Sequence, residues 1–263
     1  MTKKQVTQAI LQCNDQGGKA FVPYIMAGDG GLQTLKENIL FLQEAGATAI
    51  EVGIPFSDPV ADGEVIQKAG ERALAEGVTL RKVMKELASF KDEVTVPLVI
   101  MTYLNPVLSY GLQVIAADCE ASGVYGLIVP DLPLEESDLL KDALKDSDVA
   151  LIQLVSLTSP AERIEAIAKA AEGFIYAVTV NGITGVRSSF TEGLEGHLER
   201  LKAASSVPVL AGFGISTPEH VRSLGALADG VIVGSAIVQA LHEGDRETVR
   251  HLIDASKNQV PNS

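Results

Sequence analysis

The feature that most constrains the fold is a regular alternation between short apolar runs and segments with helical periodicity. Each of eight apolar runs is followed by a helical pattern, and no hairpin signal lies between neighbouring runs. The predicted strands are residues 21–28, 49–54, 97–103, 126–131, 150–156, 174–180, 207–214 and 230–235. This alternation predicts a (β/α)8 TIM barrel with an extra N-terminal helix over residues 3–15. The main alternative is a doubly wound open sheet.

Composition bounds the number of domains and the kinds of partner. A chain of 263 residues with 46% hydrophobic content can form one large core, so residues 1–263 are expected to be a single domain. The net charge of −13 argues against nucleic acid or an anionic membrane as partner. Because no apolar run suits a membrane span or a signal peptide, we expect a cytoplasmic protein. Cys13 and Cys119 lack metal-ligand spacing and are interpreted as reduced, structural residues.

In such a barrel the residues at the carboxyl ends of the strands face the active site. No lysine falls within a predicted strand, which argues against a Schiff-base aldolase. His197, His220, His242 and His251 all lie in helical or helix-flanking segments, so no histidine metal site or histidine base is expected at a strand end. The chemistry that remains is carboxylate acid/base catalysis without an obvious cofactor.

Two carboxylates are candidates for that chemistry. Glu51 has the opposite parity to Ile50 and Val52 in its strand, so one charge points where the core should be. Burying an unpaired charge is costly, so a carboxylate at this place needs a function or a partner. Asp62 follows in the loop after the strand, and a strand-borne Glu with a loop-borne Asp can flank one ligand.

Glycine-rich segments predict a phosphate site. Residues 211–218 follow the seventh strand, and residues 234–237 open a short helix after the eighth. Backbone N–H groups at such helix starts bind phosphate, and the Ser235 hydroxyl adds a donor. A third candidate is the segment 182–185 after the sixth strand. Tyr103 and Tyr176 are candidates to stack on a planar ligand.

Two local predictions concern the sixth unit and the helix before it. The long segment 180–196 is rich in Gly, Ser and Thr, and we interpret it as a loop that closes over the site. In the preceding helix, which is predicted to end at residue 171, Ser159 is the expected N-cap and Pro160 the first helical residue.

The residues now described carry a resemblance over nearly the whole chain. The motifs, in chain order, are AIEVGIPFSDPVADGEVIQKA, TYLNPV, GLIVPDLPLEES, GITG, AGFGIST and VGSAIV. In this order they resemble the α subunit of tryptophan synthase. The resemblance implies a TIM-barrel lyase that cleaves indole-3-glycerol phosphate to indole and glyceraldehyde 3-phosphate by a retro-aldol reaction, in L-tryptophan biosynthesis.

The resemblance also implies roles for particular residues. Glu51 would move the protons, and Asp62 would hydrogen-bond the indole N–H. The other implied substrate-binding residues are Tyr24, Met101, Tyr103, Ile128, Tyr176, Thr184 and Phe213. The implied phosphate-binding residues are Gly185, Gly214, Gly234 and Ser235.

A partner is implied as well. The family associates with a pyridoxal-phosphate β subunit in an αββα heterotetramer and passes indole to it, so this chain itself is expected to need no cofactor. Asp58, Asn105 and Asp131 lie in loops that the resemblance places toward that partner. The chain departs from the family pattern at Glu64, Gly30 in place of a usual proline, Leu104 and Tyr125. None of these departures falls on the proposed catalytic pair.

Three alternatives stay open. One is a stand-alone lyase that releases free indole, and another is a non-catalytic subunit that senses phosphate ligands. A third is a different phosphate-binding barrel enzyme, although such enzymes use a strand-end lysine or a histidine, which the predicted strands lack.

Overall fold

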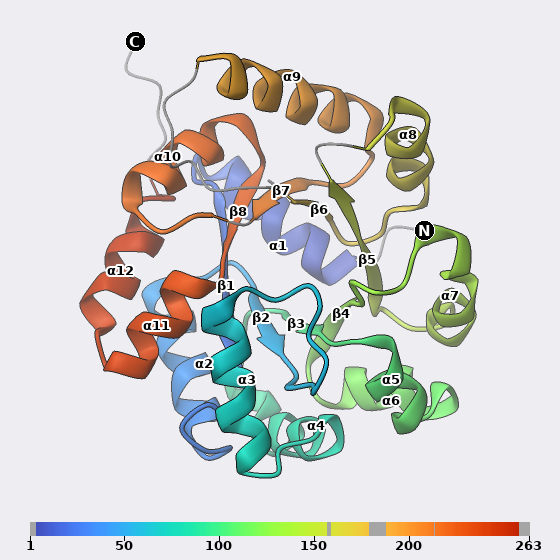
Figure 1. Ribbon diagram of the computed structural model, residues 1–263, viewed down its shortest axis with the longest axis vertical. Coiled ribbons are helices and arrows are strands. Elements are labelled where there is room, and N and C mark those ends of the chain that lie inside the picture. The colour runs from blue at the N-terminus through green and yellow to red at the C-terminus, as the bar shows by residue number, and fades with distance from the viewer. Residues whose placement is uncertain (1–3, 157–158, 179–187, 213, 258–263) are drawn as a thin grey trace.

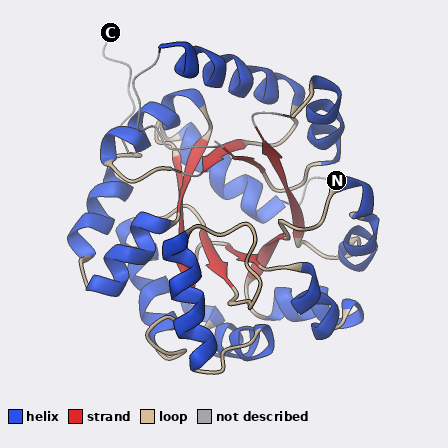
Figure 2. Cartoon of the chain, in the orientation of Figure 1, coloured by secondary structure: helices blue, strands red, loops and turns tan. Residues whose placement is uncertain are grey.

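The computed structural model describes residues 4–156, 159–178, 188–212 and 214–257. Eight parallel strands pair in chain order, and β1 pairs with β8 to close the barrel. Figure 2 shows the strands as an inner ring with the helices around it. Closure excludes the open sheet and confirms the predicted (β/α)8 barrel. The strands are β1 (Ala20–Met26), β2 (Ile50–Gly53), β3 (Leu98–Met101), β4 (Val124–Ile128), β5 (Ala150–Ser156), β6 (Ile175–Val178), β7 (Val209–Gly212) and β8 (Gly230–Val233).

The helices form the outer layer (Figure 1). In the first half of the chain they are α1 (Lys4–Asp15), α2 (Thr34–Ala45), α3 (Glu64–Ala75), α4 (Leu80–Ser89), α5 (Leu104–Tyr110) and α6 (Leu112–Ala121). In the second half they are α7 (Asp138–Leu144), α8 (Ala161–Ala170), α9 (Ser188–Ala204), α10 (Pro218–Leu227), α11 (Ser235–Glu243) and α12 (Arg246–Asp254). Short 3-10 turns span Lys91–Glu93 and Leu134–Glu136.

The extra helix α1 lies at the amino-terminal end of the barrel. Val6 and Ile10 are buried on it, which anchors its apolar face. The hydroxyl of Thr7 donates a hydrogen bond of 2.7 Å to the carbonyl of Gly173, just before β6 begins. The predicted N-terminal helix is therefore present and covers the end of the barrel opposite the carboxyl ends of the strands.

Several local predictions can be compared with the structure. The four histidines lie on helices α9 to α12, and the described strands contain no lysine, both as expected. Cys13 on α1 and Cys119 on α6 are free, and burial raises the pKa of the Cys119 thiol to about 12. None of the helices in the described part of the chain has both the length and the apolar character needed to span a bilayer.

The predicted cap of α8 is wrong. The helix begins at Ala161, and its N-cap is Pro160 rather than Ser159. Pro160 has an extended backbone, with φ −59° and ψ 151°, and therefore stands outside the helix. The N–H of Ser159 instead donates to the carbonyl of Ser156 at 3.0 Å, so this serine belongs to the turn that follows β5.

The prediction of a loop over residues 180–196 is also wrong for the second part of this segment. Residues 179–187 lie outside the described residues, but helix α9 already begins at Ser188. Leu194, Leu198 and Leu201 are buried at intervals of four and three residues, which is the spacing of one helix face. Burial of that face outweighs the low helix propensity of Gly193 and Gly196, which favoured a loop in the sequence.

Closure of the barrel yields a first prediction, at Gly230 on β8. Gly230 is the register partner of Ala20 on β1, and a β-carbon at residue 230 would lie 2.4 Å from the Ala20 carbonyl oxygen. Backbone cannot yield as a flexible side chain can, so Gly230→Ala should lower the free energy of unfolding by about 3 kcal/mol. Urea unfolding measures this loss.

The control for this prediction is Gly63→Ala. A β-carbon at Gly63 would meet nothing within 4 Å, and the φ of Gly63 is −75°, which alanine adopts freely. This variant should stay within about 1 kcal/mol of the wild type. Equal stability of the two variants would contradict the close approach of β1 and β8.

Candidate active site

Glu51 is held inside the carboxyl end of the barrel by strand β2. The strand is buried throughout, and the Glu51 side chain shares its face with neighbours in register, Tyr24 on β1 and Val99 on β3. Glu51 is only 1% exposed, and neither carboxyl oxygen has a hydrogen-bond partner among the described residues. The prediction that Glu51 points into the barrel is therefore confirmed.

The surroundings of Glu51 change its ionisation. Burial raises the pKa of its carboxyl to about 8, and the nearby negative charge of Asp62 adds to the rise. A carboxyl group in this range can both give and take a proton near neutral pH. That property suits acid/base catalysis better than a structural role.

Asp62 is placed by the loop between β2 and α3. The Tyr103 hydroxyl accepts a 3.0 Å hydrogen bond from the N–H of Ala61, and the Tyr103 ring stacks on Phe56 with centroids 5.0 Å apart. Burial raises the pKa of Asp62 to about 6, while a hydrogen bond from Tyr103 opposes the rise. Tyr103 therefore both fixes the loop and favours the ionised form of Asp62.

The two carboxyls share one cavity of about 270 Å³ at the carboxyl ends of the strands. Among the predicted substrate residues, Tyr24, Met101 and Tyr176 line it together with Glu51 and Asp62. Tyr103 does not line this cavity, and instead contacts the loop that carries Asp62, through its hydrogen bond with Ala61. Ile128 is fully buried at the end of β4, beside Met101 in register, and does not line it either. Thr184 and Phe213 lie outside the described residues.

The opposite side of the same cavity is made of glycines and a helix start. Gly214, Gly234 and Ser235, predicted to bind phosphate, all line the cavity, whereas Gly185 lies outside the described residues. Helix α11 begins at Ser235, and no side chain caps its N-terminus. Its first intrahelical donor is the N–H of Ile237, so the preceding N–H groups of the first turn are directed toward an incoming anion.

Sequence reasoning missed several apolar residues that line the cavity. Ile66 comes from the first turn of α3, Ile215 from the loop after β7 and Ile232 from β8. Ile215 lies inside the glycine-rich segment 211–218, which the sequence did single out. Ile66 and Ile232 instead belong to regular apolar patterns, which look the same for core and pocket residues. Ser216 is the one polar lining residue that was missed, and its position inside the glycine-rich segment after β7 was the available signal.

The described lining of the cavity contains no lysine, arginine or histidine. The phenols of Tyr24 and Tyr176 stay neutral because burial raises the pKa of each well above its ordinary value. Within the described residues, no three side chains of the kinds that bind metals come together. An anion in this cavity would therefore rely on backbone N–H groups and hydroxyls.

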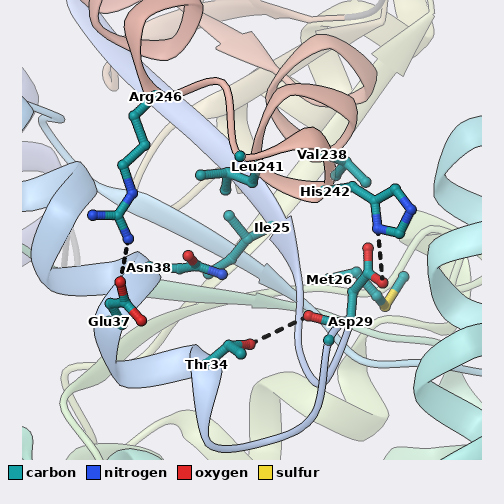
Figure 3. A pocket seen from close by; sticks show the side chains of 12 residues that line it. Ile25, Met26, Asp29, Thr34, Glu37, Asn38, Val238, Leu241, His242 and Arg246 are labelled. Carbon is teal, nitrogen blue, oxygen red and sulfur yellow. Dashed lines mark hydrogen bonds and ion pairs between the residues drawn. The ribbon is translucent and has the colours of Figure 1, made fainter.

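A second cavity, of about 250 Å³, lies outside the barrel wall beside α2 and α11 (Figure 3). There Asp29, in the loop after β1, accepts two hydrogen bonds of 2.6 and 2.7 Å from Arg72 on α3. Figure 3 shows the Asp29 carboxylate turned toward His242 on α11, whose Nδ1 is 3.8 Å away. At the other side of this cavity, Arg246 at the start of α12 pairs with Glu37 on α2. Asp29 is thus bonded to α3 and lies close to α11, the two helices that begin beside the active-site cavity.

The departure at Gly30 has a backbone reason. Gly30 has a φ of +83° in this loop, which glycine adopts easily. Proline holds φ near −65°, so a proline at this place would require a different path of the loop after β1.

Burial of an unpartnered Glu51 yields a prediction about stability. Its pKa in the folded protein is about 8, above the ordinary value of 4.5, so the folded state binds more protons between these values. Stability therefore falls as the pH rises through this window. Glu51→Gln removes the loss: the variant should match the wild type at pH 5 and exceed it at pH 9, by on the order of 4 kcal/mol at about 1.4 kcal/mol per pKa unit.

Urea unfolding at the two pH values measures this difference. Glu165→Gln, an exposed position on α8, is the matched control and should leave the pH dependence as in the wild type. If Glu51→Gln followed the wild-type pH dependence as well, the unpartnered state of Glu51 would be refuted.

Comparisons with known proteins can now be set beside this geometry. The family model described as "Tryptophan synthase alpha chain" matches residues 10–261. The chain is 53% identical to the tryptophan synthase alpha chain of Bacillus cereus, over 92% of this chain and 94% of that protein, and 51% identical to that of Bacillus anthracis over the same shares.

Solved structures agree with these sequence matches. The tryptophan synthase alpha chain of Legionella pneumophila superposes with a TM-score of 0.87 at 32% identity, covering 99% of both chains. A chain of Mycobacterium tuberculosis tryptophan synthase also gives a TM-score of 0.87 at 32% identity, covering 97% of this chain and 99% of that chain. Fold, sequence and the extent of the match lead to one conclusion: the chain belongs to the tryptophan synthase alpha chain family.

Proposed function

We propose that this chain cleaves indole-3-glycerol phosphate to indole and glyceraldehyde 3-phosphate, with Glu51 as the proton-transfer group and Asp62 as the partner of the indole N–H. The activity follows from membership of the tryptophan synthase alpha chain family, a lyase family of L-tryptophan biosynthesis. The observation that carries the residue roles is the buried, unpartnered carboxyl of Glu51, which shares one cavity with Asp62.

The substrate has three parts, and the cavity offers a place for each. Support for phosphate binding comes from the start of α11, where backbone N–H groups at Gly234 and Ser235 and the Ser235 hydroxyl border the cavity. Gly214, with φ +75°, lines the same side. The indole ring would lie at the other side, between Met101 and the phenols of Tyr24 and Tyr176.

Asp62 provides the charge for the indole end of the reaction. With a pKa of about 6, its carboxyl is mostly ionised at neutral pH. The carboxylate accepts a hydrogen bond from the indole N–H and stabilises the positive charge that spreads over the ring when C3 is protonated. Tyr103 orients it through the loop, and Thr184, as part of the segment predicted to close over the site, is proposed to help hold it.

Glu51 supplies the proton and recovers it. With a pKa of about 8 it is mostly protonated at neutral pH, and it gives its proton to the indole C3. The bond between C3 and the glycerol side chain then breaks, and its electron pair returns to the ring. Glu51, now a carboxylate, takes the proton of the hydroxyl on the carbon that leaves, which becomes the aldehyde. Glu51 ends the cycle protonated, as it began.

The catalytic roles predict the behaviour of two conservative variants. Glu51→Gln keeps the shape but loses the transferable proton, and Asp62→Asn keeps the shape but loses the negative charge. Each should depress indole release from indole-3-glycerol phosphate by at least about a hundredfold, the loss expected for one acid/base or electrostatic group. Activity near that of the wild type in either variant would refute the role of that residue.

A tryptophan synthase β subunit is the partner that the family implies. We propose that the assembly is an αββα heterotetramer, that the β subunit carries pyridoxal phosphate, and that indole passes directly to it. Asp58 and Asp131 are exposed in the loops after β2 and β4. The prediction that Asn105 lies in a loop is wrong, because this residue is in the first turn of α5, but it too is exposed, which suits an interface at this rim. Asp131 also has a role within the chain, since it accepts a 2.9 Å hydrogen bond from the N–H of Leu104. The cytoplasmic location stays a prediction.

Adding the partner tests this proposal. Indole release by the purified chain should be slow alone and should rise roughly tenfold or more with a tryptophan synthase β subunit, the size of a typical coupling between sites. Fast release that is indifferent to the β subunit would instead favour the stand-alone lyase. Absence of release under both conditions, with phosphate ligands still bound, would favour the ligand-sensing subunit.

A further inference from the structure

A third cavity, of about 370 Å³, lies on the outer side of strand β5 and is called the β5 cavity below. Its lining comes from the loop after β4, from β5 and from helix α8, which lies beside β5 (Figure 1). No described residue lines both this cavity and the one that contains Glu51 and Asp62. Its volume is near the lower end of the range of about 300–1,000 Å³ that is usual for small-molecule sites, so it suits a small ligand.

The lining includes one buried polar side chain that its surroundings do not explain. Gln153 stands between Ile152 and Leu154 in an otherwise apolar part of β5. Leu154 is the register partner of Tyr176, which faces the active-site cavity, so Gln153 points to the opposite, outer face of the strand. That face packs on α8, and an apolar residue is expected there.

The amide of Gln153 has no partner within the fold. The residue is 7% exposed, but no hydrogen bond joins its side chain to another residue in the described part of the chain. Burying an unpaired amide is costly, and most buried polar groups are paired with protein, water or ligand. Because Gln153 borders the β5 cavity, a partner for its amide has its place there.

The walls around Gln153 are apolar. Leu151 comes from the same strand, Leu134 from the turn after β4 and Ile167 from α8. Leu151 and Ile167 are buried, and Leu134 is half-buried. A molecule in the cavity meets these side chains through apolar surface only. One amide among apolar walls is the usual make-up of a site for a small molecule.

The charged residues of the lining leave no free partner for an anion beside Gln153. Arg163 on α8 is partly exposed and donates two hydrogen bonds to Glu135. Asp131 is exposed and already accepts a hydrogen bond from the N–H of Leu104, so its charge lies in water. A charged molecule would therefore lose its hydration without gaining a counterion in the described lining. An uncharged molecule meets no such cost.

We propose that the β5 cavity binds a small uncharged molecule of mainly apolar surface, held by a hydrogen bond to the Gln153 amide. An amide both donates and accepts, so the ligand needs one group such as a ring N–H or a carbonyl. Indole belongs to this class, because it is neutral, planar and has a single N–H, which donates to Oε1 of Gln153. Indole as the natural ligand rests on the proposed function, in which it is the product, whereas the site itself does not.

Titration of the full chain with indole tests the site by NMR. The isoleucine δ-methyl groups are labelled with carbon-13 and the glutamine amides with nitrogen-15. The signals of Ile167 and Gln153 are identified by their loss in Ile167→Val and Gln153→Leu. Indole should shift both signals saturably and give a nuclear Overhauser effect to the Gln153 amide protons, which binding in the active-site cavity would not give. An Ile167 signal that does not respond to indole would overturn the proposal.

The variant Gln153→Leu removes the hydrogen bond and keeps the apolar walls. It should weaken indole binding, followed at Ile167, roughly five- to tenfold, the loss expected for one hydrogen bond. Gln113→Leu, at an exposed position on α6, is the matched control and should bind indole as the wild type does. Equal affinity of Gln153→Leu and the wild type would refute the role of the amide.

A charged probe tests the class of ligand. Indole-3-acetate has the same ring with a carboxylate attached, and it should bind in the β5 cavity at least about tenfold more weakly than indole. Tighter binding of indole-3-acetate than of indole would refute the preference for an uncharged molecule.

The outcomes for the site and for the proposed function are separate, because the titration needs no turnover. A wild type that binds indole at Ile167 but releases none from indole-3-glycerol phosphate would refute the proposed function and leave the site in place. A wild type that releases indole without a response at Ile167 and Gln153 would refute the site alone.

Discussion

The candidate active site depends on one unfavourable arrangement, a carboxyl group that is buried inside a closed barrel without a hydrogen-bond partner among the described residues. The fold tolerates Glu51 because β2 is held firmly: every residue of this strand is buried, and it pairs with β3 along its whole length and with β1 from Glu51 to Gly53. A carboxyl in an open, hydrated position would titrate near its ordinary value and would be ionised at neutral pH. The stability of the barrel therefore maintains the proton on Glu51, as expected when function opposes local stability.

The two carboxyls differ because they stand on different kinds of element. Glu51 extends from a strand, where its neighbours are fixed by register and mostly apolar. Asp62 extends from a loop, where the Tyr103 hydroxyl and partial hydration favour its charge. Burial raises the pKa of both carboxyls, to about 8 for Glu51 and about 6 for Asp62, and this difference suits the proposed roles of a proton donor and a charged stabiliser.

The sequence was enough to predict the barrel fold and the end of the barrel at which the candidate site lies, because both depend on regular patterns. Strand and helix alternation indicated the topology, and the parity of Glu51 indicated its direction. Where it failed, a local signal competed with packing: Gly193 and Gly196 suggested a loop, but the buried face of α9 prevailed. Ile66 and Ile232 carried no signal at all, since an apolar residue beside a cavity looks like any core residue. The cavity beside Gln153 required coordinates, because its lining comes from β5, α8 and the loop after β4.

The separate parts of the site are connected through the outer layer of helices. Asp62 immediately precedes α3, and the proposed phosphate site is the first turn of α11. These two helices pack on each other, and Asp29 holds Arg72 on α3 while its carboxylate faces His242 on α11. Asp29 is almost buried, and its two hydrogen bonds to the partly exposed Arg72 join the loop after β1 to α3. Asp62 lies two residues before the start of α3, at the end of this helix that borders the cavity. The helix that follows Asp62 and the helix that begins at the proposed phosphate site are therefore packed against each other, although the two groups are proposed to meet opposite ends of the substrate.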